Sequence, residues 1–238
     1  MSLKDRVVVI TGVSRPGQIG QAVALAFARA GARLVLAART AANVEARARE
    51  CRELGAEAVG VAVDLATEAG AAALAREVQS RFGSPQVLVN LAGGLTVYRP
   101  AVDHTLADWQ KELQNNLTTA FLTTRALFPL MREGGGGSVI NFTRAGLPQA
   151  NMVAYNCAKA GVEALTRTFA LEGRDHNIRV NAVGPGLTDT EQNLEQMKPK
   201  DTSRWARKED IAAVVLFLAS DESAGITGQV LQVAGKGI

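Results

Sequence analysis

The fold is decided near the start of the chain by Val7-Val8-Val9-Ile10-Thr11-Gly12-Val13-Ser14-Arg15-Pro16-Gly17-Gln18-Ile19-Gly20. Its first four residues are uniformly apolar, which predicts a strand covered on both faces. A helical pattern, Gln21–Ala30, follows the glycines. Glycines permit a tight turn, and the start of a helix offers free N–H groups to a pyrophosphate. The stretch predicts a strand, a phosphate loop and a helix, although Gly-x4-Gly-x2-Gly spacing also fits a plain glycine turn.

Short apolar runs recur along the chain with helical patterns between them. The predicted strands are Arg6–Thr11, Arg33–Ala38, Ala58–Val63, Gln86–Leu91, Ser138–Phe142, Ile178–Val183 and Gln229–Val233. This alternation predicts an α/β fold: a single doubly wound Rossmann domain, residues 1–238, whose seven-stranded parallel sheet is flanked by helices on both faces. The Gly134–Gly137 run lies between a helical pattern and a strand and is interpreted as a loop. In such folds ligands bind beyond the carboxyl ends of the strands.

Composition excludes several classes of function. The 238 residues are 47% hydrophobic, and 26 lysines and arginines, scattered along the chain, stand against 23 acidic residues, so nucleic-acid binding is not expected. No apolar leader precedes the first strand, and the apolar stretch Ile211–Ala219 is too short to cross a bilayer, so we expect no membrane partner. Cys51 and Cys157 give neither a disulfide framework nor a metal-ligand cluster, which fits a cytoplasmic protein without a metal.

The residue after the second predicted strand indicates which dinucleotide is bound. An NAD site usually places a carboxylate there for the ribose 2′-hydroxyl, but this chain has Arg39. Together with Arg15 in the glycine loop, Arg39 could hold a 2′-phosphate, because a guanidinium matches phosphate geometry. We therefore predict NADP(H) rather than NAD(H); the alternative is that both arginines are merely solvated.

Tyr155 and Lys159 lie four positions apart, which on a helix places a phenol and an ammonium on one face. A nearby positive charge favours phenolate and lowers the pKa of the tyrosine toward useful proton transfer. The pair predicts an acid–base catalyst, although a Tyr and a Lys at this spacing are also common on solvated helix faces.

Taken together, these motifs resemble the short-chain dehydrogenase/reductase family over essentially the whole chain. The resemblance includes Arg179-Val180-Asn181 and Ile226-Thr227-Gly228 as family landmarks. It implies that the cofactor is bound by Gly12, Ser14, Arg15, Gly17, Ile19, Gly20, Arg39, Asp64, Leu65, Asn90, Ala92, Gly93, Tyr155, Lys159, Pro185, Gly186, Thr188 and Thr190. The nearest members are similar to 3-oxoacyl-acyl-carrier-protein reductases and broad carbonyl reductases.

The resemblance also implies a reaction and a catalytic set. Hydride passes between a nicotinamide and a carbonyl carbon, Tyr155 exchanges the proton, Lys159 holds the ribose hydroxyls and lowers the phenol pKa, and Asn116 keeps a relay water in place. The family's serine is missing, because the segment after the fifth strand is Asn141-Phe142-Thr143-Arg144. The expected set is Asn116, Thr143, Tyr155 and Lys159; either Thr143 or Arg144 replaces the serine, or activity is weakened.

Other functions remain open. The altered serine segment also fits a nucleotide-binding sensor or scaffold with little catalysis. A lyase or dehalogenase relative is disfavoured by the glycine loop and Lys159, and an enoyl reductase by the three residues between Tyr155 and Lys159. The short polar segment Glu191–Asp201 is interpreted as a compact lid, which predicts an open pocket for a small-molecule substrate. The family implies a homo-oligomer, a tetramer or a dimer, and apolar surface on Thr118–Met131 and Val153–Leu171 is compatible with subunit contacts.

Overall fold

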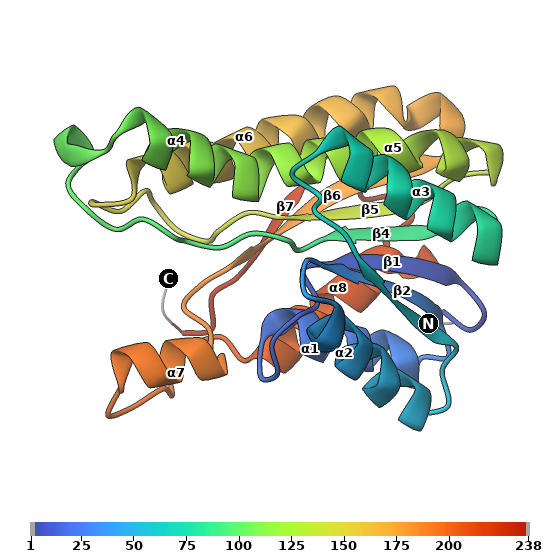
Figure 1. Ribbon diagram of the computed structural model, residues 1–238, viewed down its shortest axis with the longest axis horizontal. Coiled ribbons are helices and arrows are strands. Elements are labelled where there is room, and N and C mark those ends of the chain that lie inside the picture. Colours follow the sequence, from blue (N-terminus) through green and yellow to red (C-terminus); the bar gives the residue numbers. More distant parts are fainter. Residues whose placement is uncertain (1–2, 237–238) are drawn as a thin grey trace.

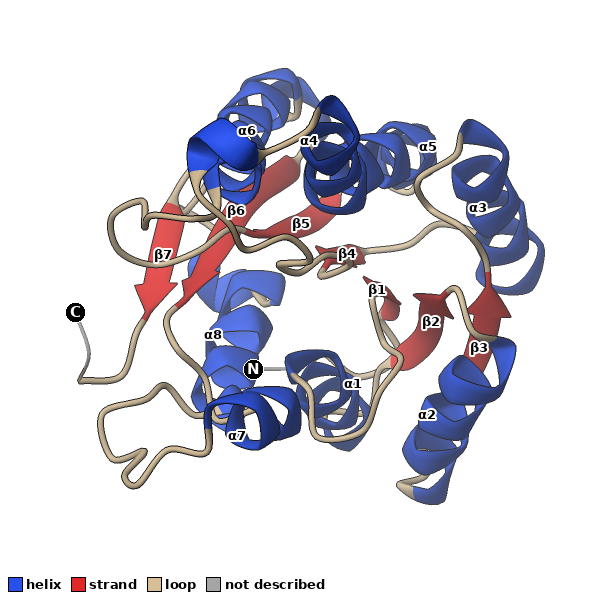
Figure 2. Ribbon diagram, turned by 60° about the vertical axis from the view of Figure 1, so that its left-hand side comes forward, coloured by secondary structure: helices blue, strands red, loops and turns tan. Residues whose placement is uncertain are grey.

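The computed structural model describes residues 3–236, so residues 1–2 and 237–238 of the predicted domain lie outside the described residues. Seven strands form one parallel sheet in the order β3-β2-β1-β4-β5-β6-β7 (Figure 2). The strands are β1 Val7–Thr11, β2 Arg33–Ala38, β3 Ala58–Ala62, β4 Val87–Asn90, β5 Gly137–Phe142, β6 Ile178–Pro185 and β7 Val230–Val233. The predicted doubly wound fold is confirmed.

Helices cover both faces of this sheet (Figure 1). One layer contains α1 Ile19–Arg29, α2 Ala41–Glu53 and α8 Lys208–Ala219. The opposite layer contains α3 Glu68–Phe82, α5 Thr119–Glu133 and α6 Val153–Glu172, with α4 Leu106–Leu113 packed against α6. The short helix α7 Glu191–Met197 follows β6, and a π-helical turn, Gln114–Thr118, joins α4 to α5. Short 3-10 turns lie at Ala101–Asp103, Arg174–His176 and Asp221–Ser223.

The apolar strands are buried from both sides because successive side chains point to opposite faces. Val8 and Ile10 pack into the core that includes α1, α2 and α8, whereas Val9 packs into the core that includes α3, α5 and α6. Burying a side chain of this size contributes about 1.5–3 kcal/mol relative to leaving it exposed. The two cores hold the sheet rigid beneath the ends of its strands.

Strand ends differ from the sequence prediction where a neighbouring strand determines them. β6 continues past the predicted end at Val183, because Gly184 and Pro185 pair with the end of β7. The glycine run after α5 is a loop only as far as Gly136, because Gly137 already begins β5; Gly135, Gly136 and Gly137 all adopt positive φ. No helix among residues 3–236 is both long and apolar enough to span a bilayer.

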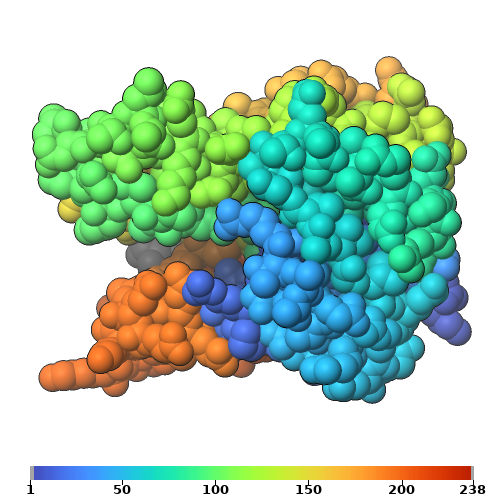
Figure 3. All heavy atoms as spheres, viewed as in Figure 1, coloured from blue at the N-terminus to red at the C-terminus, as the bar shows by residue number. Residues whose placement is uncertain are grey.

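The carboxyl edge of the sheet faces a hollow. After β1 the chain passes to β2, and after β3 it returns to β4 on the other side of β1. This reversal is the switch point at which ligands bind in doubly wound sheets. In the space-filling view a hollow separates the green α4 region from the orange α7 region at this end of the molecule (Figure 3).

Candidate active site

The phosphate loop occupies the turn between β1 and α1. Gly12 and Gly17 have φ values of 75° and 63°, in the region that favours glycine. A Cβ on Gly12 would lie 2.7 Å from the Ala92 backbone nitrogen, and one on Gly20 would lie 2.8 Å from the Gly12 oxygen. The helix begins at Ile19 without a side-chain cap. The glycines thus allow close backbone approach, and among the described residues no side chain caps the helix start, an arrangement that fits a pyrophosphate.

A hydroxyl on β1 fixes the end of β4, and the sequence analysis did not identify it. Thr11 Oγ1 accepts hydrogen bonds from the backbone N–H groups of Leu91, at 3.0 Å, and Ala92, at 3.1 Å. Thr11 is fully buried. This bridge spans the switch point and holds the predicted element Asn90-Leu91-Ala92-Gly93 against the glycine loop.

The residues predicted to hold the adenosine end lie at the carboxyl ends of β1, β2 and β3. Arg15 and Arg39 are exposed, and neither makes an ion pair or side-chain hydrogen bond among the described residues. Ser14 accepts a hydrogen bond from Asn43 at 3.1 Å. Asp64 follows β3 in an Asx turn with Ala66, and Leu65 is buried. These two guanidinium groups fit an additional phosphate.

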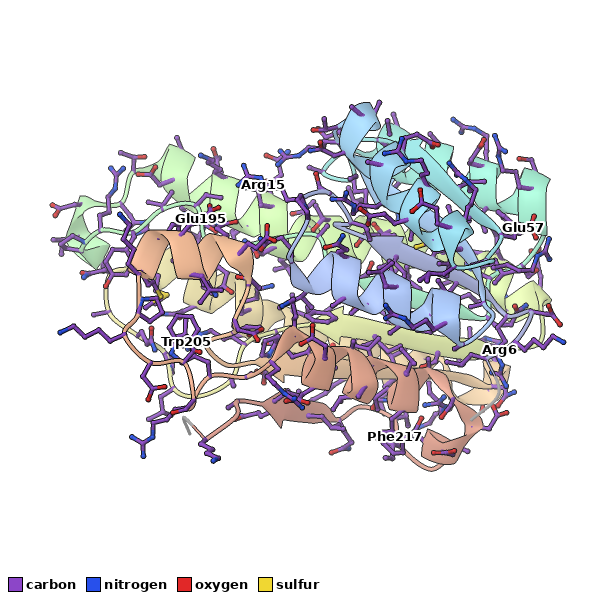
Figure 4. All side chains as sticks on the ribbon, turned by 90° about the horizontal axis from the view of Figure 1, so that it is seen from below. Arg6, Arg15, Glu57, Glu195, Trp205 and Phe217 are labelled. Carbon is purple, nitrogen blue, oxygen red and sulfur yellow. The ribbon has the colours of Figure 1, made fainter. Side chains whose placement is uncertain are left out.

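The residues predicted for the nicotinamide end follow β6. Pro185 closes the strand, and the Thr188 hydroxyl donates to the Gly186 carbonyl at 2.8 Å. Thr190 caps α7 by accepting from the Asn193 N–H at 3.3 Å. The residue after Thr190 brings α7 to the phosphate loop, because Glu191 N–H donates to the Gly17 carbonyl at 3.1 Å. Arg15 and Glu195 of α7 lie at the same end of the molecule (Figure 4).

Tyr155 and Lys159 lie on one face of α6, as their spacing predicts. Lys159 Nζ lies 5.6 Å from the centroid of the Tyr155 ring and donates to the Phe142 carbonyl at 2.9 Å. Lys159 is buried and Tyr155 is partly buried. The pair therefore stands where β5 ends, directly above the carboxyl edge of the sheet.

The predicted lowering of the tyrosine pKa is wrong in direction. Burial raises the pKa of Tyr155, the charge of Arg144 opposes this increase, and the charge of Glu112 adds to it. Burial also lowers the pKa of Lys159 to about 8, against the charge of Glu112. Desolvation disfavours the charged form of each group, so it outweighs the neighbouring charges here.

Asn116 lies in the π-helical turn, fully buried. Its Nδ2 donates to the carbonyl oxygens of Gly94 and Glu112, each at 3.1 Å, and to Glu112 Oε2 at 3.0 Å. Its Oδ1 accepts from the Gly94 N–H at 2.9 Å. Single π turns inside helices often occur at functional sites, because they redirect side chains. Here the turn aims Asn116 at the segment that follows β4.

The structure distinguishes the two residues considered as replacements for the family's serine. The Thr143 hydroxyl donates to the Lys159 carbonyl at 3.1 Å and also lies 3.3 Å from Glu163 Oε1. Its single hydrogen is thus directed at α6. Arg144 is partly buried, donates to the Leu147 carbonyl, and acts by its charge on Tyr155.

Glu112 is the functional candidate that sequence reasoning missed. It is fully buried on α4 and hydrogen-bonds to Asn116, and its charge acts on both Tyr155 and Lys159. A signal was present: Trp109, Glu112 and Asn116 recur at helical spacing, so the carboxylate shares a face with the predicted asparagine. A glutamate in a helix is nevertheless usually exposed.

Comparison with known proteins identifies the family. A family model described as enoyl-(acyl carrier protein) reductase matches residues 12–235. The 3-oxoacyl-[acyl-carrier-protein] reductase FabG of Pseudomonas aeruginosa is 33% identical and covers 99% of this chain and 98% of its own length. The 7alpha-hydroxysteroid dehydrogenase of Clostridium sardiniense is 32% identical, covering 98% of this chain and 93% of its own.

A solved structure agrees with these relatives. A 7 alpha-hydroxysteroid dehydrogenase complexed with NADH and 7-oxo glycochenodeoxycholic acid superposes with a TM-score of 0.90 at 31% identity, covering 99% of this chain and 95% of that one. The glycine cradle at the switch point, the Tyr155–Lys159 face and these full-length matches lead to one assignment. The chain belongs to the short-chain dehydrogenase/reductase family of oxidoreductases, which use nicotinamide cofactors.

Proposed function

We propose that this protein is an NADP(H)-dependent oxidoreductase that reduces a carbonyl to an alcohol, or the reverse, with Tyr155 as acid and base. The whole chain acts as one catalytic domain. The observation that carries the proposal is the position of Tyr155 beside Lys159, 5.6 Å from ring centroid to Nζ, at the carboxyl end of β5. The spacing of Tyr155 and Lys159, with three residues between them, supports carbonyl reduction rather than enoyl reduction.

Tyr155 supplies the proton. When bound, the reduced nicotinamide supplies a hydride, which leaves negative charge on the substrate oxygen. A phenol whose pKa burial has raised stays protonated at neutral pH and can donate to that oxygen. In the oxidative direction the phenolate must form first, and the positive charge of Arg144 favours it.

Lys159 and Asn116 prepare the site for this proton transfer. The lysine ammonium, held by the Phe142 carbonyl, is placed to bind ribose hydroxyls beside the tyrosine. Asn116 is fixed by the segment after β4 and is placed to order a relay water. Both roles rest on the resemblance of these positions to the family's catalytic residues.

Arg144 polarises the substrate carbonyl in this proposal, in place of a serine. The structure supports Arg144 over Thr143, because the threonine hydrogen is directed at α6. We expect Arg144→Met to lower kcat about 10²–10³-fold, the usual effect of losing one such donor. Thr143→Val should change kcat much less, and the opposite ranking would exclude Arg144 from this role.

The cofactor preference rests on Arg15 and Arg39, two exposed arginines that have no side-chain partner within residues 3–236. We infer NADP(H) because each can bind a 2′-phosphate bidentately. The substrate is a small carbonyl compound or alcohol, and the names of the relatives favour 3-oxoacyl thioesters and cyclic ketones. The family further supports a cytoplasmic homo-oligomer, a tetramer or a dimer, that pairs through α5 and α6.

The deciding experiment measures NADPH oxidation by the purified protein with 3-oxoacyl thioesters, ketones, aldehydes and quinones. Tyr155→Phe is assayed in parallel. Turnover by the wild type that disappears in the variant supports the proposal and begins to define the substrate. NADPH binding without turnover would instead support the alternative, a sensor or scaffold, to which the altered serine segment also corresponds.

A further inference from the structure

Two charged side chains, Glu112 and Lys159, are buried among residues 3–236, with 0% and 5% of their surfaces exposed. They have opposite signs and lie on α4 and α6, two helices that pack together. No direct ion pair joins them in the described chain, because Lys159 Nζ instead donates to the Phe142 carbonyl. An isolated buried charge is strongly unfavourable, and the charge of Glu112 acts on Lys159.

Hydrogen bonds hold both oxygens of the Glu112 carboxyl group in place. Its Oε1 accepts from the Thr96 N–H at 2.6 Å, the Thr96 hydroxyl at 2.7 Å and the Val97 N–H at 2.7 Å. Its Oε2 accepts from Asn116 Nδ2 at 3.0 Å. The two backbone N–H groups and the Asn116 amide can only donate, whereas the Thr96 hydroxyl can donate or accept. The charge of Glu112 acts on both Tyr155 and Lys159.

The same carboxylate, together with the backbone of Gly94, holds Asn116 in one orientation. The Gly94 N–H can only donate, so the amide atom facing it at 2.9 Å is Oδ1, and Nδ2 must face Glu112 and the Gly94 carbonyl. Glu112 thus joins α4, the π turn and the Thr96–Val97 segment into one network. Without it, Asn116 Nδ2 would lose its charged partner.

We propose that Glu112 is a positioning residue of the active site, whose carboxylate fixes Asn116 and provides the buried negative charge that keeps Lys159 an ammonium. This inference rests on the proposed function. Burial lowers the pKa of Lys159 to about 8, and Glu112 acts against that decrease. A neutral Lys159 would lose the charge with which it holds ribose hydroxyls beside Tyr155.

The other charged groups near Glu112 and Lys159 interact with different partners. Arg144, from the segment after β5, acts on Tyr155. Glu163, one turn beyond Lys159 on α6, interacts with the Thr143 hydroxyl and with Arg167. The π turn contributes uncharged amides. Glu112 is the carboxylate whose charge acts on both Tyr155 and Lys159.

The first test measures the ionisation of Lys159 directly. Protein with lysines labelled with ¹³C at Cε is titrated by NMR, with the Lys159 signal assigned from Lys159→Arg. Glu112→Gln removes the charge, so the pKa of Lys159 should fall by about one unit or more. Thr96→Val is the matched control: it removes a hydrogen bond to the carboxylate but leaves the charge, and the pKa should stay near that of the wild type. An unchanged pKa in Glu112→Gln would overturn the proposal.

The second test uses the reaction. In Glu112→Gln both Lys159 and Tyr155 should lose their protons at lower pH, so the alkaline limb of kcat for carbonyl reduction should move to lower pH. Glu112→Asp keeps the charge, so its alkaline limb should lie closer to that of the wild type than the limb of Glu112→Gln does. If Glu112→Gln does not fold, the wild-type titration decides, because a Lys159 that is neutral at pH 7 would refute the inference. An inactive wild type would refute the proposed function but leave the NMR test intact.

Discussion

Replacing Arg39 tests how the protein selects its cofactor. Arg39 and Arg15 are exposed and have no partner among the described residues, so neither contributes a contact that the fold needs. A hydrogen bond to a charged group contributes about 1.5–3 kcal/mol, and exposure places each arginine near the lower limit. Arg39→Ala should therefore weaken NADPH binding roughly tenfold, and adding Arg15→Ala about a hundredfold in total.

The assay is titration of nucleotide fluorescence with NADPH and with NADH at two salt concentrations. NADH affinity should change less than about twofold, because a bare ribose gives the guanidinium groups no phosphate to bind. Arg29→Ala is the matched control, since it removes an exposed arginine from the far end of α1. A higher salt concentration should weaken the binding of NADPH more than the binding of NADH. The NADP(H) preference would be refuted if the wild type bound both nucleotides with equal affinity. It would also be refuted if Arg39→Ala lost the same factor of affinity for NADPH and for NADH.

Two further predictions concern the cradle and the lysine. Gly12→Ala places a Cβ 2.7 Å from the Ala92 backbone at a φ of 75°, whereas Gly55→Ala meets no atom within 4 Å at a φ of 86°. Chemical denaturation should show Gly12→Ala less stable than Gly55→Ala by about 1–3 kcal/mol, and similar values would contradict the close packing at the switch point. Because burial lowers the pKa of Lys159 to about 8, the ammonium is lost as pH rises through that value. Nucleotide affinity should decline above about pH 8 in the wild type but not in Lys159→Arg, and parallel curves would show that another group is responsible.

The strands could be predicted because their environment is simple. A run such as Val7–Ile10 is buried on both faces, and alternate residues enter different cores, so apolar residues are required at every position. The end of β6 could not be predicted, because Gly184 and Pro185 have low strand propensity and belong to the strand only through pairing with β7.

The site was predictable where one residue type has one physical purpose. The glycines of the phosphate loop are needed for positive φ and close backbone approach, and Tyr155 and Lys159 share a helix face by spacing alone. The direction of the Thr143 hydroxyl depends on the Lys159 carbonyl and Glu163, which only the packing of α6 supplies. The burial of Glu112 likewise depends on donors from the segment after β4, far from its own helix.

The phenol pKa shows why spacing could not settle the chemistry. Four residues of separation place the Lys159 ammonium near the Tyr155 ring, 5.6 Å from its centroid, but the same packing removes both groups from water. Desolvation disfavours phenolate and ammonium together, so burial raises one pKa and lowers the other. The charge of Lys159 can be predicted from the sequence, but the burial of both side chains depends on tertiary packing. A protonated phenol can donate a proton to a substrate oxygen, and the charge of Arg144 acts against the increase in the pKa of this phenol.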